Sequence, residues 1–214
     1  MMKELFIPRA LLLAVAVYAL YTGSNYLLAQ PGPAASETVR PLQMEGTMTT
    51  KHSHEERALL AGGCFWGVEE LIRKLPGVKS TRVGYTGGEV EQPTYEVIKT
   101  GTTGHAESIE VVFDPQKLRY EALLRYFFRL HDPTTMNQQG NDRGTQYRSA
   151  IFYLSDEQKQ TALQVRDELE RSKKWKSPIV TEITPAKTFY AAEEYHQDYL
   201  QKNPHGYTCH YLRD

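Results

Sequence analysis

Segments with the hydrophobic patterns of strands and helices follow one another along most of this chain, and their order limits the folds that it can adopt. Strands show alternating or continuously apolar residues, whereas helices repeat apolar residues every three or four positions. These patterns predict strands at residues 57–63, 78–85, 105–113 and 146–154, a helix that ends before Pro76, and a helix that begins at Pro115. The order β-α-β-β-α-β is that of the ferredoxin-like βαββαβ unit. We therefore expect an α+β fold, a two-layer α/β sandwich with a mixed sheet.

Additional C-terminal elements are expected after this core. They comprise a helix to about residue 174, a short strand at 179–183, a helix at 189–200 and an irregular tail at 203–214. The first of these helices begins at a capping-box pattern, Ser155 followed by Gln158. The tail contains Pro204 and Gly206, and these residues predict a mobile, exposed segment.

The N-terminal segment, residues 1–29, differs from the rest of the chain. The basic residues Lys3 and Arg9 precede an apolar run at residues 10–21, which is typical of a signal peptide. Read as one piece, residues 10–29 are also about long enough to anchor the chain in a bilayer. In both interpretations the positive charge precedes the apolar run, so the remainder is expected outside the cytoplasm, periplasmic or secreted.

Residues 30–56 contain several prolines, serines and threonines and no aromatic residue, so we expect a flexible linker before a globular domain at residues 57–214. The formal charge of −1 gives no support for nucleic-acid binding, which needs a clustered basic surface. The 2 cysteines, Cys64 and Cys209, are too few for a disulfide scaffold or a cysteine-rich zinc site. We expect a monomer without metal or cofactor.

Cys64 is the first candidate for chemistry, because it lies where the first strand ends and the first helix begins. Unpaired N–H groups and the dipole at a helix start favour a thiolate, which is the nucleophilic form of cysteine. Gly62 and Gly63 leave the sulfur uncrowded and favour a reactive thiol over a small buried apolar residue. Cys209, on the mobile tail, could reach Cys64 and form a disulfide; an inert terminal cysteine is the alternative.

Glu107 is the second candidate. His105, Glu107, Ile109, Val111 and Phe113 have the same parity in their strand, and this parity is the more apolar face. A carboxyl group in apolar surroundings has a raised pKa and can act as a general acid near neutral pH. If the strand instead begins at Ile109, Glu107 is a solvated loop residue, and both interpretations are open.

Aromatic and polar residues elsewhere are weaker candidates. Phe65 and Trp66 follow Cys64 and either form the wall of an apolar pocket or pack in the core. Tyr95 and Tyr147 supply hydroxyl groups, and residues 139–144 form a polar, glycine-containing turn. None of these residues indicates a reaction by itself.

Five blocks of sequence, taken together, resemble one family. They are GCFWG at residues 63–67, GHAE at 104–107, HDPT at 131–134, QGNDRGTQYRS at 139–149 and YAAEEYHQDYLQKNP at 190–204. In this order they are similar to the A-type peptide methionine sulfoxide reductases, and the resemblance covers residues 57–214. It implies a two-layer α/β sandwich and reduction of the S epimer of methionine sulfoxide, free or in oxidised proteins that are thereby repaired.

The resemblance also implies roles for individual residues. Cys64 would attack the sulfoxide sulfur, Glu107 would protonate its oxygen, and Cys209 would convert the resulting sulfenic acid to a disulfide. By the same resemblance, the oxygen is bound by Tyr95 and Tyr147, the methyl group by Phe65 and Trp66, and Asp142 has a supporting role in the substrate site. Thioredoxin or another dithiol protein is the expected reductant.

One feature departs from the family pattern. Many members carry Gly-Tyr-Cys near the C-terminus, whereas this chain has an additional Thr208 between Tyr207 and Cys209.

Two other functions are compatible with the residues alone. The first is a thiol peroxidase in which Cys64 reacts with hydroperoxide, and the second is an extracytoplasmic binding module held together by a disulfide between the cysteines.

Overall fold

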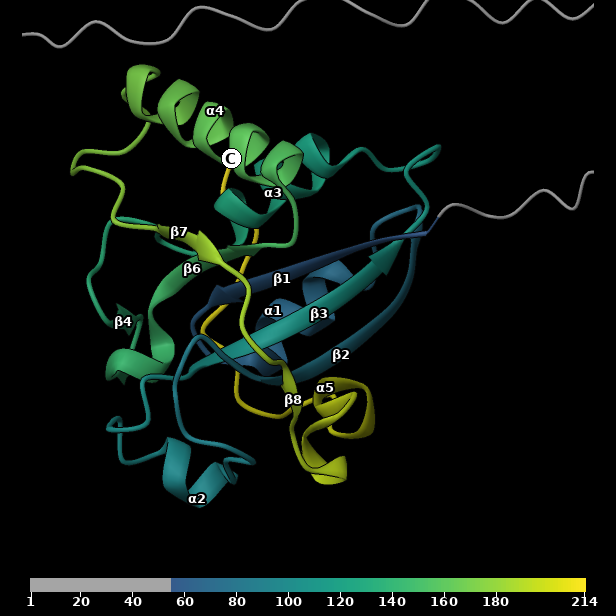
Figure 1. Ribbon diagram of the computed structural model, residues 1–214, viewed down its shortest axis with the longest axis vertical. Coiled ribbons are helices and arrows are strands. Elements are labelled where there is room, and N and C mark those ends of the chain that lie inside the picture. Colours follow the sequence, from purple (N-terminus) through teal and green to yellow (C-terminus); the bar gives the residue numbers. More distant parts are fainter. Residues whose placement is uncertain (1–54) are drawn as a thin grey trace, which may run out of the picture. The chain divides into compact units, whose positions relative to one another are not determined.

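The computed structural model describes residues 55–214, so the expected signal peptide or anchor at residues 1–29 lies outside the described residues, as does the linker up to residue 54. The described part is built around a six-stranded sheet with the order β7-β6-β1-β3-β2-β8 (Figure 1). Its first strand begins at Glu56, one residue before the expected domain start.

The strands of this sheet are β1 (Glu56–Gly62), β2 (Val78–Thr86), β3 (Ala106–Phe113), β6 (Ser149–Tyr153), β7 (Glu182–Pro185) and β8 (Tyr190–Ala191). A separate ribbon consists of β4 (Gln138–Gln139) and β5 (Asp142–Arg143). The helices are α1 (Phe65–Ile72), α2 (Tyr95–Ile98), α3 (Tyr120–Leu130), α4 (Asp156–Arg171) and α5 (Tyr199–Lys202), with single 3₁₀ turns at Thr145–Tyr147 and Glu194–His196.

The pairing of the strands confirms the expected topology. Strand β1 is antiparallel to both β3 and β6, and β2 is antiparallel to β3, which is the strand order of a ferredoxin-like unit. Strand β7 runs parallel to β6 and makes the sheet mixed. The fold is therefore the expected α+β sandwich with additional C-terminal elements.

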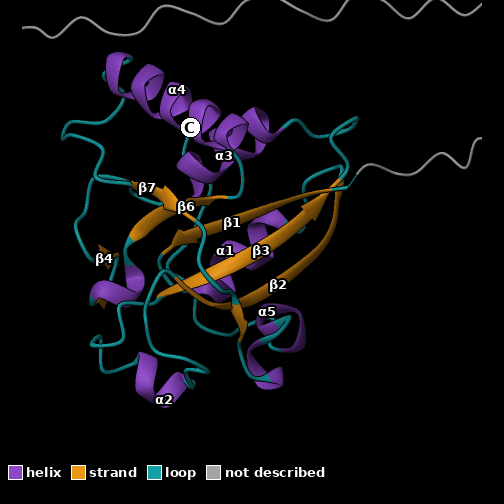
Figure 2. Cartoon of the chain, in the orientation of Figure 1, coloured by secondary structure: helices purple, strands orange, loops and turns teal. Residues whose placement is uncertain are grey.

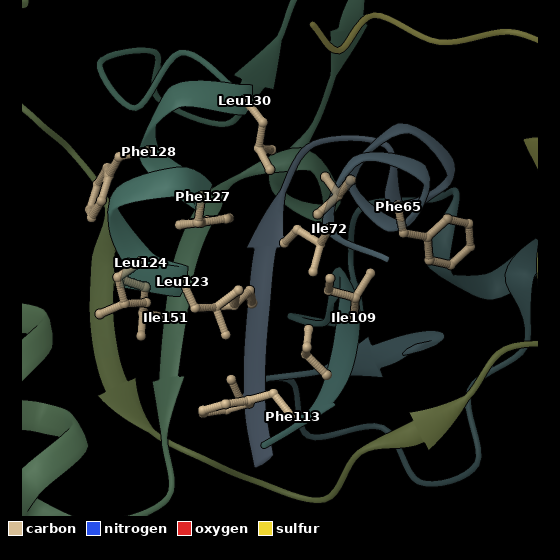
Figure 3. Packing of buried hydrophobic residues seen from close by; sticks show 14 of the residues in the cluster. Phe65, Ile72, Ile109, Phe113, Leu123, Leu124, Phe127, Phe128, Leu130 and Ile151 are labelled. Carbon is tan, nitrogen blue, oxygen red and sulfur yellow. The ribbon is translucent and has the colours of Figure 1, made fainter. Parts of the chain in front are cut away.

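The main core lies between the sheet and the helices α1, α3 and α4, which cover one of its faces (Figures 2 and 3). Leu60, Ile109 and Phe127 are fully buried there, and each such side chain stabilises the fold by about 1.5–3 kcal/mol. A smaller cluster on the opposite face includes Leu59 and Phe152. The alternation along β1 thus sends neighbouring residues to opposite faces, as expected of a strand.

The second helix begins later than expected. Residues 115–118 form a turn, and α3 starts at Tyr120. The carboxyl of Asp114 accepts the N–H of Gln116 over 3.0 Å, and its carbonyl accepts the N–H of Leu118 over 2.9 Å. These local bonds close the turn at the position where the proline was expected to open a helix.

The expectation of one helix at residues 189–200 is wrong. This segment contains β8, a 3₁₀ turn and the start of α5. The side chain of Gln197 bonds to both the N–H and the carbonyl of Val83, each over 2.9 Å, so it pairs with β2 as another strand would. Asp198 then adopts φ 54°, which a continuous right-handed helix cannot contain.

Smaller differences concern element ends. A 3₁₀ turn replaces the first part of the strand expected at residues 146–154, β7 begins at Glu182, and α2 was not expected. Ser155 is the N-cap of α4 and accepts the N–H of Gln158 over 3.2 Å, as the capping-box pattern predicts. Within residues 55–214, no helix combines the length and the apolar composition needed to cross a bilayer.

Candidate active site

Cys64 lies at the junction of β1 and α1, where it is the N-cap residue of the helix. The tight turn before it depends on Gly63, whose φ is +100°. A Cβ at that position would lie 2.5 Å from the Cβ of Gln139, so only glycine fits. The side chain of Cys64 is buried, with 6% of it exposed.

The protonation state of Cys64 differs from the expectation. Burial raises the pKa of its thiol well above the usual value, and the nearby carboxyl of Glu107, in its ionised form, acts in the same direction. The backbone N–H of Trp66 lowers that pKa, as expected at a helix start, but its effect is smaller than that of burial. The resting thiol is therefore protonated, and it becomes a good nucleophile only when its proton leaves.

Glu107 lies inside β3, and 2% of it is exposed. The strand begins at Ala106, so the alternative of a solvated loop residue is wrong and the apolar-face interpretation is confirmed. Burial raises the pKa of its carboxyl to about 8, although the N–H of Phe65, 3.2 Å from Oε2, lowers it. At pH 7 the carboxyl is therefore mostly neutral and can donate a proton.

Tyr95 and Tyr147 come from separate segments of the chain, and the carboxyl of Glu107 influences both hydroxyls. Tyr95 is the first residue of α2 and is half-buried; burial, followed by the charge of Glu107, raises its pKa to about 12. Tyr147 ends a 3₁₀ turn, and burial together with the charge of Glu107 raises its pKa as well. Both hydroxyls therefore stay protonated and can donate hydrogen bonds at the same site.

Trp66 and Phe65 have different surroundings. The indole of Trp66 stacks on Tyr199 with a centroid separation of 3.8 Å, and its Nε1 donates to Nδ1 of His196 over 3.1 Å. Phe65 is 1% exposed and packs against the rings of Tyr85 and His196. Trp66 is thus held at the edge of the site, and Phe65 connects the site to the core.

His196 is a site residue that the sequence analysis missed. It is 1% exposed, and its ring centroid lies 4.4 Å from that of Tyr95. Its Nδ1 accepts a hydrogen from Trp66, so the neutral ring carries its proton on Nε2, 4.0 Å from Oε2 of Glu193. Burial lowers the pKa of His196, which keeps the ring neutral. No periodicity signals this role, because it depends on contacts between distant segments.

Most residues of the C-terminal tail are exposed, as its sequence predicts, but the part around Cys209 packs on the domain. Nε2 of His210 lies 2.7 Å from the carbonyl oxygen of Gly62, and His210 is 8% exposed. A Cβ at Gly67 would lie 2.5 Å from Nδ1 of His210, so the tail packs directly on the first turn of α1. These contacts hold Cys209 half-buried next to the junction that carries Cys64. Both cysteines are free thiols.

Residues 139–144, expected as a turn, belong to the β4–β5 ribbon, which contacts both of these regions. At its tip Gly140 has φ +58°, and a Cβ there would lie 3.1 Å from the Cβ of Cys209. The carboxylate of Asp142 accepts hydrogen bonds from the hydroxyl of Tyr207 over 3.1 Å and from Sγ of Cys209 over 3.2 Å. The ribbon thus brings a carboxylate to the second thiol.

The arrangement combines a nucleophile, a neutral acid, hydroxyl donors and an aromatic wall. Such a set can protonate and bind a polar oxygen while sulfur attacks the atom that carries it. No cluster of three or more His, Cys, Asp or Glu side chains suited to a metal ion occurs within residues 55–214.

Comparison with known proteins agrees with this chemistry. A family model described as peptide methionine sulfoxide reductase matches residues 56–214. The peptide methionine sulfoxide reductase MsrA of Mycobacterium sp. (strain MCS) is 57% identical over 161 residues, which cover 75% of this chain and 92% of the relative.

Solved structures give the same result. Reduced Mxr1 from Saccharomyces cerevisiae superimposes with a TM-score of 0.71 at 42% identity, over 75% of this chain and 93% of that chain. The structure of Mxr1 in complex with Trx2 has a TM-score of 0.53 at 28% identity, over 79% and 97% of the two chains.

Proposed function

Because this chain belongs to the peptide methionine sulfoxide reductase family and reduces the S epimer of methionine sulfoxide, we propose that Cys64 is the nucleophile and Glu107 the proton donor. One observation carries this assignment. The carboxyl of Glu107 is buried, has a pKa of about 8 and bonds to the N–H of the residue next to Cys64. The acid is therefore neutral and adjacent to the nucleophile.

The first half-reaction transfers one oxygen atom. Glu107 protonates the sulfoxide oxygen while Sγ of Cys64 attacks the sulfoxide sulfur. The S–O bond of the substrate breaks, methionine leaves, and the hydroxyl ends on Cys64 as a sulfenic acid. The proton of the Cys64 thiol returns to Glu107, so the carboxyl acts as a catalyst and is not consumed.

The substrate is held by the aromatic residues and hydroxyls around the two reacting groups. Tyr95 and Tyr147 stay protonated and donate to the sulfoxide oxygen, on which negative charge would otherwise develop. The methyl group contacts Trp66, whose orientation is fixed by His196 and Tyr199, and the edge of Phe65. Asp142 belongs to the rim of this site.

The second half-reaction regenerates the thiol. Cys209 attacks the sulfenic acid on Cys64, which forms a disulfide and releases water. A dithiol protein then reduces the disulfide. Thioredoxin is the proposed donor, because the similar Mxr1 forms a complex with Trx2. The two free thiols also argue against a module that depends on a permanent disulfide.

Single turnover without reductant tests the two cysteine roles. Cys64→Ser should form no methionine, because a hydroxyl is far less nucleophilic than a thiolate. Cys209→Ser should form one equivalent of methionine and retain a sulfenic acid that a cyclic 1,3-diketone traps. A Cys64→Ser protein that still forms methionine would show that Cys64 is not the nucleophile. A wild-type protein that forms methionine but no disulfide between Cys64 and Cys209 would show that Cys209 does not take part.

We also propose an extracytoplasmic location, periplasmic or secreted, for the domain at residues 56–214. The proposal is based on the basic residues and apolar run of residues 1–29. Cell fractionation of the full chain, compared with a chain that begins at Lys51, tests it. The full chain should leave the cytoplasm and the shortened chain should stay there with full activity; equal distribution of the two would overturn the proposal.

A further inference from the structure

We propose that Asp142 is a catalytic residue of the second half-reaction, in which its carboxylate accepts the proton of Cys209 while that thiol attacks the sulfenic acid. The inference rests on the proposed function of the two cysteines. It gives Asp142 a role in disulfide formation in addition to its place at the rim of the substrate site.

The geometry places one carboxylate oxygen directly on the reacting sulfur. Sγ of Cys209 donates to Oδ2 of Asp142 over 3.2 Å, while the hydroxyl of Tyr207 donates to Oδ1 over 3.1 Å. The two donors come from one tail and approach the two oxygens of a single carboxylate. This arrangement fixes the rotation of the carboxylate and directs Oδ2 at the thiol proton.

The chemical need for a proton acceptor is strong at this position. Burial, with the hydrogen bond and charge of Asp142, raises the pKa of the Cys209 thiol to about 12. At pH 7 almost none of it is thiolate, and a thiol is a poor nucleophile. As the S–S bond forms, however, the attacking sulfur loses electron density and its proton becomes acidic. A base that already holds that proton can then remove it without a separate ionisation step.

A second acceptor, the Nδ1 of His210, is less suited to this task. It lies 3.6 Å from Sγ of Cys209, farther than Asp142. Its ring is turned so that Nε2 donates to the carbonyl of Gly62, and burial lowers its pKa. The ring therefore takes up a proton less readily than a histidine in water would.

The ribbon holds Asp142 in place independently of the tail. In β4, the side chain of Gln139 accepts the N–H of Asp132 and donates to its carbonyl, each over 3.2 Å. β4 pairs with β5, with Gln139 opposite Asp142. The carboxylate is thus anchored to a rigid element on one side of the thiol.

Two bonds and two protons change places in the proposed step. The S–S bond between Cys209 and Cys64 forms while the S–O bond of the sulfenic acid breaks. Glu107 gives its proton to the departing hydroxyl, which leaves as water, and Asp142 receives the proton of Cys209. The sulfur of Cys64 is reduced and that of Cys209 oxidised, and solvent exchange returns a proton from Asp142 to Glu107.

The main test follows sulfenic acid and disulfide after one turnover of the full-length Asp142→Asn protein with methionine sulfoxide. The rate is measured from the moment methionine has formed, so weaker substrate binding does not enter. The disulfide should form about 10²–10⁴-fold more slowly than in the wild type, and the diketone should trap the sulfenic acid. Tyr207→Phe, which keeps the carboxylate, is the matched control and should lose less than tenfold. Disulfide formation at the wild-type rate in Asp142→Asn would overturn the proposal.

A second measurement does not depend on turnover. In a Cys64→Ser background only Cys209 can be alkylated, and its rate against pH reports the pKa of that thiol. Asp142→Asn should shift this profile to lower pH, because the neighbouring negative charge is removed. An unchanged profile would show that the carboxylate does not contact the thiol in solution. Failure of the proposed function looks different, because Cys209→Ser would then retain thioredoxin-dependent turnover.

Discussion

The backbone N–H of Phe65 lies 3.2 Å from Oε2 of Glu107 and joins the first turn of α1 to the middle of the sheet. This bond lowers the pKa of the carboxyl, yet burial outweighs it and the pKa is about 8. The residue that follows Cys64 thus positions the carboxyl of Glu107. The proposed acid and the proposed nucleophile are therefore connected through one backbone contact at the start of α1.

The pH dependence of the first half-reaction follows from this carboxyl. The neutral form predominates below pH 8, so the single-turnover rate of methionine formation should fall as pH rises through about 8. In Glu107→Gln this rate should be about 10²–10⁴-fold lower and should no longer decrease as pH rises through 8. Glu110→Gln is the matched control, since Glu110 faces the opposite side of β3 and pairs with Arg82. An unchanged rate in Glu107→Gln would remove this residue from the mechanism.

The same shift predicts an effect on stability. The pKa of Glu107 in the folded protein is about 8, above its ordinary value of 4.5. Its contribution to stability is therefore fully present below pH 4.5 and is lost as pH rises through 8. Relative to wild type, Glu107→Gln should gain stability between pH 5 and pH 9 by an amount on the order of a few kcal/mol. Urea unfolding of both proteins at pH 5 and pH 9 measures this gain. If the difference in free energy of unfolding between the two proteins were the same at both pH values, the carboxyl of Glu107 would not have a raised pKa.

His196 should act on substrate binding through Trp66. In His196→Ala the buried indole N–H loses its acceptor, which costs about 1–3 kcal/mol and corresponds to roughly a 5- to 150-fold change in binding. The KM for methionine sulfoxide should rise more than kcat falls. His196→Gln, which can still accept that hydrogen bond, should recover part of the loss, and His205→Ala, on the exposed tail, should have no effect. Equal KM values in His196→Ala and wild type would show that the bond does not position the indole.

Gly67→Ala tests the packing of the tail on α1. The added methyl group would contact Thr208 and lie 2.5 Å from Nδ1 of His210, so the tail has to move away. Thioredoxin-dependent turnover should fall about tenfold or more, and a protease should cleave the tail faster. Lys74→Ala, at an exposed position shortly after the helix, is the control. A variant with wild-type turnover and protection would show that the contact is dispensable.

The ion pair between the buried Glu69 and the partly buried Arg73 should determine part of the stability. Glu69 is 1% exposed and lies 2.9 Å from the guanidinium of Arg73, while burial raises the pKa of Glu69. Arg73→Met leaves this carboxyl without its cation and should reduce the free energy of unfolding by about 3–5 kcal/mol. Arg166→Met breaks an exposed pair with Asp167 and should cost less than about 1 kcal/mol in the same denaturant experiment. Equal losses would show that burial does not strengthen the first pair.

Local patterns predicted much of the core and the positions of Cys64 and Glu107, whereas the roles of these two residues were implied by the family resemblance. Alternation along one strand predicted the face on which Glu107 lies, because side chains in a strand alternate strictly between faces. Glycines between a strand and a helix predicted the position of Cys64. These features depend on residues that are close in sequence, and they hold in the structure.

Features that depend on distant contacts could not be predicted from local patterns. Gln197 replaces helical hydrogen bonds with bonds to Val83, more than a hundred positions earlier in the chain. His210 is buried against Gly62 although Pro204 and Gly206 indicate an exposed tail. In each case a side chain satisfies the backbone of a remote segment, and periodicity contains no information about such a bond.

The pairing of β1 on both of its edges has a consequence for protection against hydrogen exchange. Its backbone is bonded to β3 on one side and to β6 on the other, so its amides are expected to exchange with solvent slowly. Cys209 instead belongs to a tail without regular secondary structure, whose local opening requires less free energy. Cys64 therefore follows a strand that is expected to exchange slowly, whereas Cys209 lies on a segment that is expected to exchange faster. For the proposed disulfide to form, we therefore expect the tail to move while Cys64 keeps its position.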